Sequence, residues 1–213
     1  MKKGIYMIGL IITLASCNKA TETATSNNTP TSSITVNNLA ADTIIGLTPQ
    51  GIPFGSGKYS FYSLETNKKI TTADSATTKW DIGFRGTSII INGGNSGPGL
   101  GGGFVFVGLY NNLSAVPADS TFKVDNAPSS FAIPAGSNRG WFVYDAINNL
   151  VNPIPGRVLM IRTASGKYAK LEILNYYKGG VTPPATASDA IKLSEQRYYT
   201  FRYTYQPNGS KNF

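Results

Sequence analysis

The side chains that could do chemistry in this sequence are few in kind. The 213 residues include no histidine and one cysteine. Catalysis by Ser-His-Asp or Cys-His groups is therefore excluded, as is histidine-ligated zinc or haem. A single cysteine also allows no internal disulfide, so the fold must depend on an apolar core. Any functional site must therefore use other chemistry, and we consider carboxylates, tyrosines and methionine in turn.

Paired carboxylates can hydrolyse glycosides without histidine, because that reaction needs two acids at a fixed separation. The 11 acidic residues are dispersed, and only Asp81 and Asp145 lie in or beside aromatic segments where burial is expected. A buried aspartate more often accepts backbone hydrogen bonds or pairs with an arginine than reacts. We therefore expect no catalytic residues and a protein that is not an enzyme.

A glycine-rich stretch spans residues 93–103, where Gly97, Gly99 and Gly102 satisfy the pattern G-x-G-x-x-G. A dinucleotide site needs a helix N-terminus directly after these glycines. Here an aromatic and β-branched run follows at residues 104–107, which indicates a strand. We expect a long flexible connection between strands, with a mobile lip over a ligand as the alternative.

The N-terminus has the features of an export signal. Lys2 and Lys3 precede an apolar run at residues 5–14 that is too short to span a bilayer. Residues 14–17, Leu-Ala-Ser-Cys, match a bacterial lipobox, in which cleavage precedes the cysteine and its thiol receives acyl chains such as palmitate. We predict a signal peptide over residues 1–16 and a flexible Thr/Ser/Asn-rich tether over residues 17–38, lipidated at Cys17.

The charge is basic, with 19 Lys and Arg against 11 Asp and Glu. The basic residues are scattered, and no run is longer than Lys68-Lys69. A nucleic-acid-binding surface normally needs a basic patch or stripe. We therefore expect no nucleic acid partner.

Beyond the tether, β-branched and aromatic residues form short runs separated by Gly, Pro, Asn and Asp. This pattern predicts one all-β domain of short antiparallel strands over residues 39–213. Alternation of apolar and polar residues is clearest in residues 79–85 and 197–206. A turn containing Gly166 predicts a hairpin of residues 157–163 and 167–176. The other expected strands are 58–64, 87–92, 104–110, 121–124 and 140–145, with a helical turn near 188–193.

Several segments, in order along the chain, resemble the HmuY family of haem-binding lipoproteins. They are KWDIGFRGT at 79–87, NGGNSGPG at 92–99, residues 157–163, KYAKLEI at 167–173, YYKGG at 176–180 and YTFRY at 199–203. The resemblance implies a hand-like all-β fold whose loops grip a ligand. It also implies a lipid-anchored outer-membrane protein of Bacteroidota type at the cell surface. Such a haemophore-like protein captures haem and passes it to a TonB-dependent outer-membrane receptor during iron acquisition.

Haem or a related porphyrin is therefore the expected cofactor, but the iron ligands depart from the family. Family members that hold haem use paired histidines, or methionine in some relatives, whereas this chain has no histidine and only Met160 beyond the signal peptide. The candidate iron ligand is Tyr144 or Met160. Tyrosinate binds ferric haem, and methionine is an axial haem ligand in some proteins. The alternative for Met160 is filling the core.

By alignment of the neighbouring motifs, the ligand-carrying loops correspond to residues 126–139 and 146–155. Arg139 suits a porphyrin propionate, whereas turn formation is the alternative for the asparagines. Of Trp141 and Phe142, one is expected to line the cleft and the other the core. The expected ligand-binding residues are Asn138, Arg139, Trp141, Tyr144, Asn148 and Asn149.

Two other functions stay open. The first is a lipoprotein of the same fold that lacks iron ligation and acts as an accessory or interaction protein, or binds another small molecule. The missing histidine and paired methionine favour it. The second is binding or hydrolysis of a glycan at the cell surface, which rests only on the aromatic residues and the unpaired acids.

Overall fold

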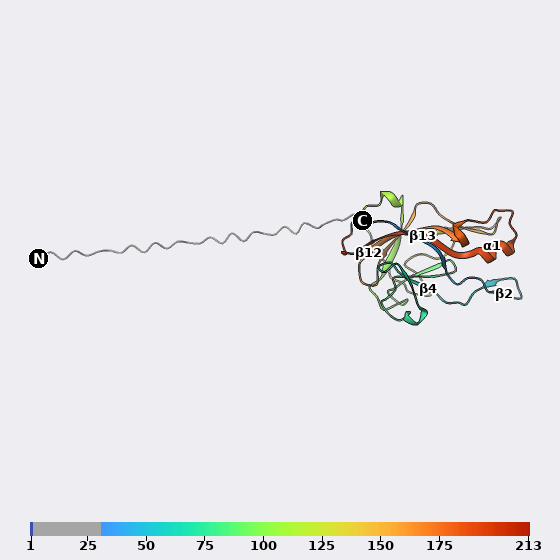
Figure 1. Cartoon of the computed structure of the whole chain (residues 1–213), viewed down its shortest axis with the longest axis horizontal. Coiled ribbons are helices and arrows are strands. Elements are labelled where there is room, and N and C mark those ends of the chain that lie inside the picture. The colour runs from blue at the N-terminus through green and yellow to red at the C-terminus, as the bar shows by residue number, and fades with distance from the viewer. Residues whose placement is uncertain (2–30) are drawn as a thin grey trace.

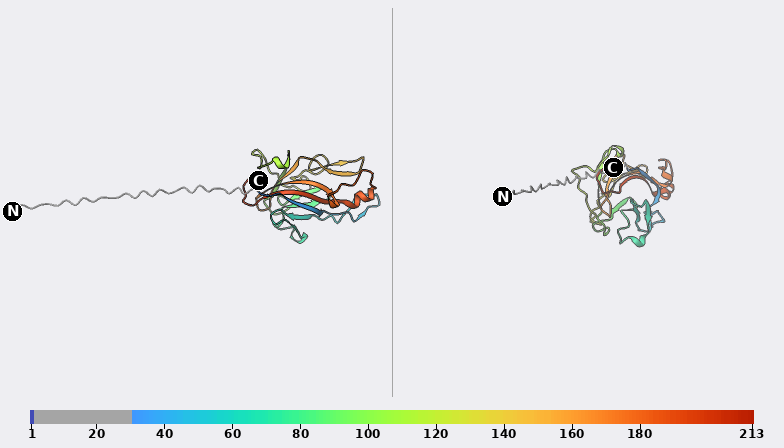
Figure 2. Two further views of the ribbon diagram at one scale, coloured as in Figure 1. Left: turned by 45° about the horizontal axis from the view of Figure 1, so that its top comes forward. Right: turned by 60° about the vertical axis from the view of Figure 1, so that its left-hand side comes forward.

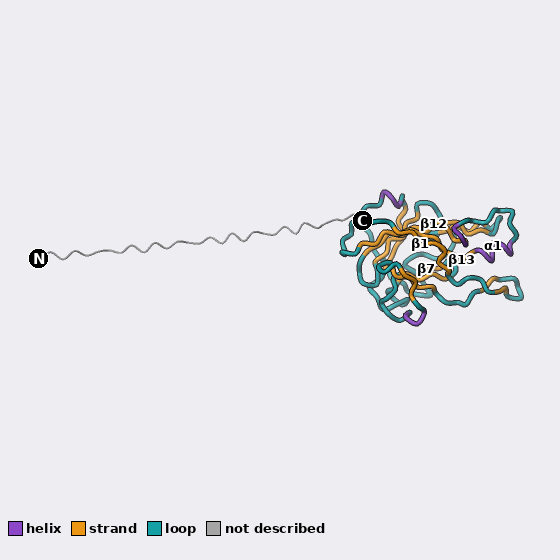
Figure 3. Tube along the Cα trace, viewed as in Figure 1, coloured by secondary structure: helices purple, strands orange, loops and turns teal. Residues whose placement is uncertain are grey.

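The computed structural model describes residues 31–213 and, at the N-terminus, Met1 alone (Figure 1). The expected signal peptide, Cys17 and most of the expected tether lie outside the described residues. Two antiparallel sheets form the body of the domain (Figure 3). Helices are short: α1 (Asp189–Glu195) and three 3₁₀ turns at Thr72–Asp74, Tyr110–Asn112 and Lys178–Gly180. The expected all-β class is confirmed.

The larger sheet has five strands in the order β1-β13-β12-β11-β8, and the smaller has four in the order β5-β4-β6-β7. The first contains β1 (Ile34–Ala40), β13 (Gln196–Gln206), β12 (Tyr168–Tyr177), β11 (Arg157–Arg162) and β8 (Gly102–Val107). The second contains β5 (Lys68–Ile70), β4 (Ser60–Ser63), β6 (Ile82–Arg85) and β7 (Ser88–Ile91).

Two hairpins and α1 extend from one end of the sheets, at the right in Figure 1 and in the left panel of Figure 2. The hairpins pair β2 (Gly46–Leu47) with β3 (Pro53–Phe54) and β9 (Phe142–Asp145) with β10 (Leu150–Pro153). The described chain enters at the opposite end of the molecule, close to the C-terminus. Among the described residues, no helix has the length and apolar character needed to cross a membrane.

The main core lies between the two sheets and follows from the alternation in the sequence. Tyr199, Phe201 and Tyr203 point from one face of β13 and have no exposed surface. Phe84 of β6 stacks on Phe201 with ring centroids 5.5 Å apart. Each buried aromatic ring removes a large apolar area from water, so this row joins the two sheets.

The far face of the larger sheet is also covered, by the segment after β8 and the C-terminal residues. Tyr110 and Met160 belong to this second cluster, which packs against Phe104, Phe122 and Phe213. Threonines on this face of β13 are accordingly buried, and the Tyr110 hydroxyl lies 2.7 Å from Thr204 Oγ1. The larger sheet is therefore a central layer with apolar clusters on both faces.

The expected end of the tether at residue 38 is wrong, because β1 begins at Ile34. Its pairing with β13 joins Ile34 to Tyr203 and Ala40 to Tyr198, with a register shift between Val36 and Leu39. The sequence Ile-Thr-Val-Asn-Asn-Leu-Ala shares Thr and Asn with the tether, but Leu39 is buried and Ile34 and Val36 pack against the main core. Backbone hydrogen bonds to β13 hold it in the sheet.

The expectation of a flexible glycine-rich connection is also wrong, because residues 93–103 are packed against the chain around them. A Cβ atom at Gly93 or Gly101 would overlap backbone atoms of the same loop, and one at Gly97 would overlap the side-chain oxygen of Asn92. Asn92 fixes the loop from inside, donating to the Trp80 and Thr77 carbonyls and accepting from the Gly99 N–H at 2.9 Å. These glycines permit close approach of backbones.

Residues 121–124 do not form the expected strand. They contribute only an isolated bridge between Lys123 and Gly103. The other expected strands are present with shifted ends, and the hairpin turn at Gly166 is confirmed, with φ +81° at that glycine. The helical turn near residues 188–193 is confirmed as α1.

Candidate functional site

A pocket of about 410 Å³ opens at the end of the molecule that carries the two hairpins and α1. We call it the rim pocket. Its walls come from four separate parts of the chain: the β2–β3 hairpin, the β6–β7 turn, the β9–β10 hairpin and the segment from α1 into β13. It is lined by Gly51, Pro53, Gly86, Thr87, Tyr144, Asn149, Tyr176, Asp189, Lys192, Leu193, Gln196 and Arg197.

Local turn chemistry sets the shape of the β9–β10 hairpin. The Asp145 carboxylate accepts hydrogen bonds from the N–H groups of Ile147 and Asn148 at 3.0 and 3.2 Å, which is an Asx turn. Asn149 completes the turn in the left-handed region, with φ +52°, a conformation that asparagine tolerates well. The turn therefore aims Tyr144 and Asn149 at α1.

A chain of hydrogen bonds joins this hairpin to α1 across the pocket. The Tyr144 hydroxyl donates to Asn149 Oδ1 at 2.8 Å, and Asn149 Nδ2 donates to Asp189 Oδ1 at 3.1 Å. Tyr144 keeps 45% of its surface exposed. Its phenol is thus positioned by a neighbour and still open to a ligand.

Two basic residues in the wall are occupied by other partners. Lys192 is 5% exposed, and its ammonium donates to the Asn148 and Ala185 carbonyls at 2.7 and 2.8 Å. Arg197 donates to the Asp42 carbonyl at 2.9 Å and lies 3.7 Å from the Asp42 carboxylate. The first contact fastens α1 to the β9–β10 hairpin, and the second fastens the start of β13 to the segment before β2.

Arg197 and Asp42 both have backbone conformations in the left-handed region, with φ +69° and +59°. Such conformations are costly outside glycine, and they persist where surrounding contacts hold them. Here the contact is the one between the two residues themselves. The Asp42 carboxylate also accepts from the Gly57 N–H at 2.8 Å, so this pair organises the base of the β2–β3 wall.

The floor of the pocket is aromatic. Tyr176 is buried beneath it, with its ring centroid 5.5 Å from that of Trp141. Burial raises the pKa of the Tyr176 phenol far above its ordinary value, with only a partial opposing effect of the Arg197 charge. This phenol therefore stays protonated, which leaves Tyr144 as the exposed phenol of the wall.

The predicted site residues separate into three groups. Tyr144 and Asn149 line the rim pocket, and Asn148 contributes its carbonyl to Lys192. Asn138 and Arg139 are exposed in the preceding loop, outside the lining. Trp141 is 2% exposed and donates to the Thr87 carbonyl at 3.0 Å, so it is a core residue.

Trp141 and Phe142 are both buried, so the expectation that one of them lines a cleft is wrong. Met160 has no exposed surface and lies in the cluster on the far face of the larger sheet. The structure therefore gives Met160 the alternative role, filling the core, and leaves it no open face toward an iron atom.

Sequence reasoning missed most of the pocket, namely the residues contributed by the β2–β3 hairpin, the β6–β7 turn and the α1–β13 segment, together with Tyr176. The expected helical turn was the one available signal. Ser188 caps α1 by accepting from the Ile191 N–H, and the polar residues of that helix, Asp189 and Lys192, face the pocket. Their proximity to Tyr144 depends on tertiary packing.

The elements that wall the rim pocket also carry exposed apolar side chains. In and around the β2–β3 hairpin, Ile45, Leu47 and Ile52 are 68%, 53% and 61% exposed, and Ile147 at the β9–β10 turn is 93% exposed. Ile191 of α1 is 48% exposed. Exposed apolar groups near a concavity are typical of surfaces that bind ligands or partners.

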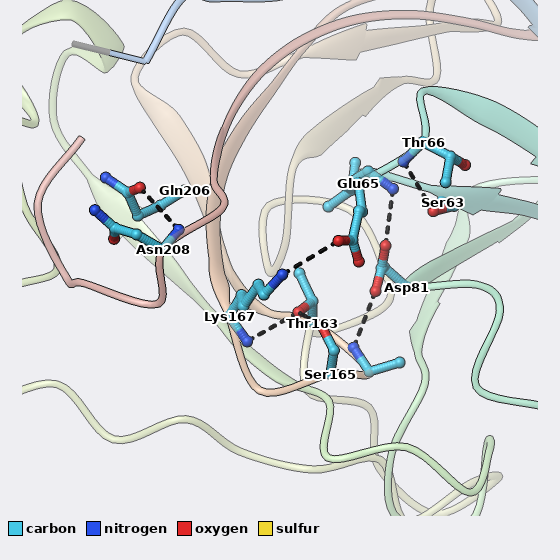
Figure 4. A network of polar contacts seen from close by, with 11 residues as sticks. Ser63, Glu65, Thr66, Asp81, Thr163, Ser165, Lys167, Gln206 and Asn208 are labelled. Atoms are coloured by element: carbon cyan, nitrogen blue, oxygen red, sulfur yellow. Dashed lines mark hydrogen bonds and ion pairs between the residues drawn. The ribbon is translucent and has the colours of Figure 1, made fainter. Parts of the chain in front are cut away.

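The two aspartates considered for catalysis have structural contacts. Asp81 is 5% exposed, and its carboxylate accepts from the Leu64 N–H at 2.8 Å and the Ala164 N–H at 2.9 Å, beside the Lys167–Glu65 ion pair (Figure 4). Burial raises its pKa and outweighs the lowering effect of these N–H groups. Asp145 is only half-buried, contrary to expectation, and its carboxylate is engaged in the hairpin turn.

The structure is an all-β domain with a pocket at one end, and one family model matches its sequence. The family model described as HmuY protein matches residues 56–186. The chain belongs to the HmuY family. No curated relative matches the sequence.

Solved structures of low sequence identity are similar to this chain. They include an apo HmuY analogue from Tannerella forsythia, with 14% identity, covering 83% of this chain and 96% of that one, at a TM-score of 0.45. A candidate HmuY-like haem-binding protein from Bacteroides vulgatus has 13% identity, with coverage of 82% and 91% and a TM-score of 0.46. A candidate lipoprotein from Bacteroides fragilis has 14% identity, with the same coverage and a TM-score of 0.45.

Proposed function

We propose that this protein is a non-enzymatic capture protein that holds haem or a related porphyrin at the rim pocket. The observation that carries the proposal is the exposed Tyr144 phenol in the wall of a pocket whose two flanking hairpins also carry the exposed apolar side chains of Leu47 and Ile147. A porphyrin is flat and apolar, so side chains on opposite walls can cover its faces and exclude water. Membership of the HmuY family supports this class of ligand.

The residues of the wall fit haem with one protein ligand to the iron. Haem, when bound, would supply a Lewis-acidic iron in an apolar ring, and Tyr144 is the residue that would meet it. Asn149 positions the Tyr144 phenol through their 2.8 Å hydrogen bond. Lys192 is held by two carbonyls, so its amine is not available as a second ligand.

The proposed setting is the outer membrane, with acyl chains on Cys17 as the anchor. The exposed side chains on the elements that wall the pocket would then serve both the ligand and a receptor that removes it. A TonB-dependent outer-membrane receptor is the partner implied by the family.

Titration with haemin tests the proposal. The purified protein carries Cys17→Ser, so that no acyl chain absorbs haemin. We expect saturable binding with a shifted Soret band, and a different band position in Tyr144→Phe. Tyr168→Phe is the matched control, because Tyr168 packs in the cluster on the far face of the larger sheet. An identical spectrum in wild type and Tyr144→Phe would remove Tyr144 as the ligand.

A second candidate function is favoured by the composition of the lining. The protein would be an accessory protein of the same fold, or would bind another small molecule or a glycan, without iron ligation. Asn149, Asp189 and Gln196 give the wall polar groups that a porphyrin does not need. Titration with metal-free protoporphyrin IX distinguishes the two functions. Equal affinity for haemin and protoporphyrin would indicate that the protein binds the porphyrin ring without a ligand to the iron. Weak, non-saturating association of both favours the second function.

A further inference from the structure

The smaller sheet has a second apolar face, directed away from the main core. Side chains alternate along its strands, so Tyr62, Ile82 and Phe84 enter the core while the residues between them face outward. One outward row joins Phe61 of β4, Gly83 of β6 and Ile90 of β7, which are register partners. Because Gly83 has no side chain, Phe61 and Ile90 close over it.

This outward face is only partly covered. Phe61, Trp80 and Ile90 form a small buried cluster, with Tyr59, Ile70 and Phe131 packed at its edge. A pocket of about 710 Å³ lies over it, which we call the sheet pocket. It is lined by Tyr59, Phe61, Ser75, Ala76, Arg85, Ile90, Asn95, Ser96, Gly97, Pro98, Ala127, Pro128 and Phe131.

The one charged residue of this lining is Arg85, and no carboxylate in the described part of the chain pairs with it. Its guanidinium lies over the Tyr59 ring at 4.5 Å and makes one long hydrogen bond, 3.4 Å, to the Gly57 carbonyl. Across residues 31–213 it takes part in no ion pair, and the lining contains no aspartate or glutamate.

A neighbouring carboxylate, Asp125, forms no ion pair with Arg85. Asp125 is 1% exposed, and its oxygens accept from the Ile91 and Ala132 N–H groups at 2.8 and 2.7 Å. A guanidinium on an aromatic ring, with most of its N–H groups free, is a ready partner for a planar anion.

We propose that the sheet pocket is a second binding site, which takes a small ring-containing carboxylate. The carboxylate would accept a paired set of hydrogen bonds from Arg85, and the ring would lie on Tyr59, Phe61 and Phe131. A neutral sugar fits less well, because the lining has no carboxylate to accept hydrogen bonds from its hydroxyl groups. This site is separate from the rim pocket and does not depend on haem.

The two tryptophans of the chain give each pocket its own reporter. Trp80 Nε1 donates to the Ser75 carbonyl at 2.9 Å, and Ser75 lines the sheet pocket. Trp141 Nε1 donates to the Thr87 carbonyl at 3.0 Å, and Thr87 lines the rim pocket. The two indole N–H signals in a ¹⁵N-resolved NMR spectrum therefore report on the two pockets separately.

The test compares 2-naphthoate with its neutral amide, 2-naphthamide, by calorimetry and by the two indole signals. We expect saturable binding of naphthoate that shifts the Trp80 signal and leaves Trp141 in place, with naphthamide at least about tenfold weaker. Equal affinity for the two probes, or a shift of Trp141 instead of Trp80, would overturn the proposal.

Substitutions at Arg85 complete the test, and its exposed side chain makes misfolding a minor concern. Arg85→Gln should weaken naphthoate to the level of the amide, and Arg85→Lys should restore only part of the loss, because lysine lacks the planar fork. Arg162→Gln is the matched control, since Arg162 lies over the Phe122 ring outside this pocket. Undiminished naphthoate binding by Arg85→Gln would overturn the assignment, whatever the outcome with haemin.

Discussion

Replacing Asp81 with asparagine measures how a buried carboxylate joins the two sheets. Its oxygens accept from Leu64, at the end of β4, and from Ala164, in the β11–β12 turn. Asparagine offers one acceptor oxygen, and its amide group must then point its N–H toward one of these donors. A buried group left without a partner costs about 1–3 kcal/mol. At this chain length that lowers the melting temperature by about 2–4 °C per kcal/mol.

The assay is urea unfolding at pH 7, followed by circular dichroism, with Asp74→Asn as the matched control. Asp74 pairs with Lys79 at 2.7 Å, but the two side chains are 25% and 64% exposed. Exposed pairs contribute about 0–1 kcal/mol. If Asp81→Asn and Asp74→Asn lower the free energy of unfolding equally, to within about 0.5 kcal/mol, then the buried contacts of Asp81 do not join the sheets as reasoned.

The difference in the free energy of unfolding between wild type and Asp81→Asn should change with pH in a defined direction. Burial raises the folded-state pKa of Asp81 above its ordinary value of 3.8, so folding favours the protonated form. The stability linked to this shift is complete below the unfolded pKa and is lost as pH rises through the folded pKa. The stability advantage of wild type over Asp81→Asn should therefore narrow as the pH rises from below 3.8 through the folded-state pKa of Asp81. An advantage that widens with pH would contradict the shift.

Two further results are expected. Burial raises the pKa of Tyr176, Tyr199 and Tyr203 well above the ordinary 10.0. In an alkaline titration followed by absorbance at 295 nm, these phenols should therefore ionise only as the protein unfolds. Ionisation of all tyrosines with one midpoint near 10 in the folded protein would contradict this. Gly97→Ala would drive a methyl group into the Asn92 oxygen and to 2.8 Å from Trp80. It should destabilise the protein more than Gly209→Ala, which meets open space at φ +78° and costs about 1–2 kcal/mol for its left-handed backbone. Equal thermal shifts for the two would show that the glycine-rich loop can yield.

Much of the β framework is predictable because alternation reports directly on burial. The aromatic row of β13 and the alternation around Phe84 identify the two faces of the core. Where residues distant in the sequence determine the packing, the local sequence pattern does not predict it. β1 resembles a polar tether in sequence because Thr and Asn residues separate its apolar ones, and its place in the sheet depends on backbone pairing with β13. The glycines of residues 93–103 suggest a flexible backbone, whereas the structure needs glycine there because neighbouring atoms leave no room for a Cβ atom.

The candidate site was accessible to prediction only in part. Tyr144 and Asn149 could be named because they lie beside aligned motifs in one hairpin. Arg197 and the Gly86–Thr87 turn enter the rim pocket through contacts between segments more than 100 residues apart, such as the Tyr199 hydroxyl on the Gly86 carbonyl at 2.8 Å. Trp141 and Met160 were assigned to a ligand for their chemistry, although their positions are internal.

The polarity of β1 determines which way the protein would face when anchored. The strand starts at Ile34 beside Tyr203 and runs toward Arg197, so the rim pocket lies at the end remote from the chain's entry (Figure 1). Between Cys17 and Ile34 the backbone can reach at most about 60 Å, at roughly 3.5 Å per residue. If acyl chains anchor Cys17, the chain enters the domain at the end opposite the rim pocket. The rim pocket would then face away from the membrane, toward ligands in the surrounding medium.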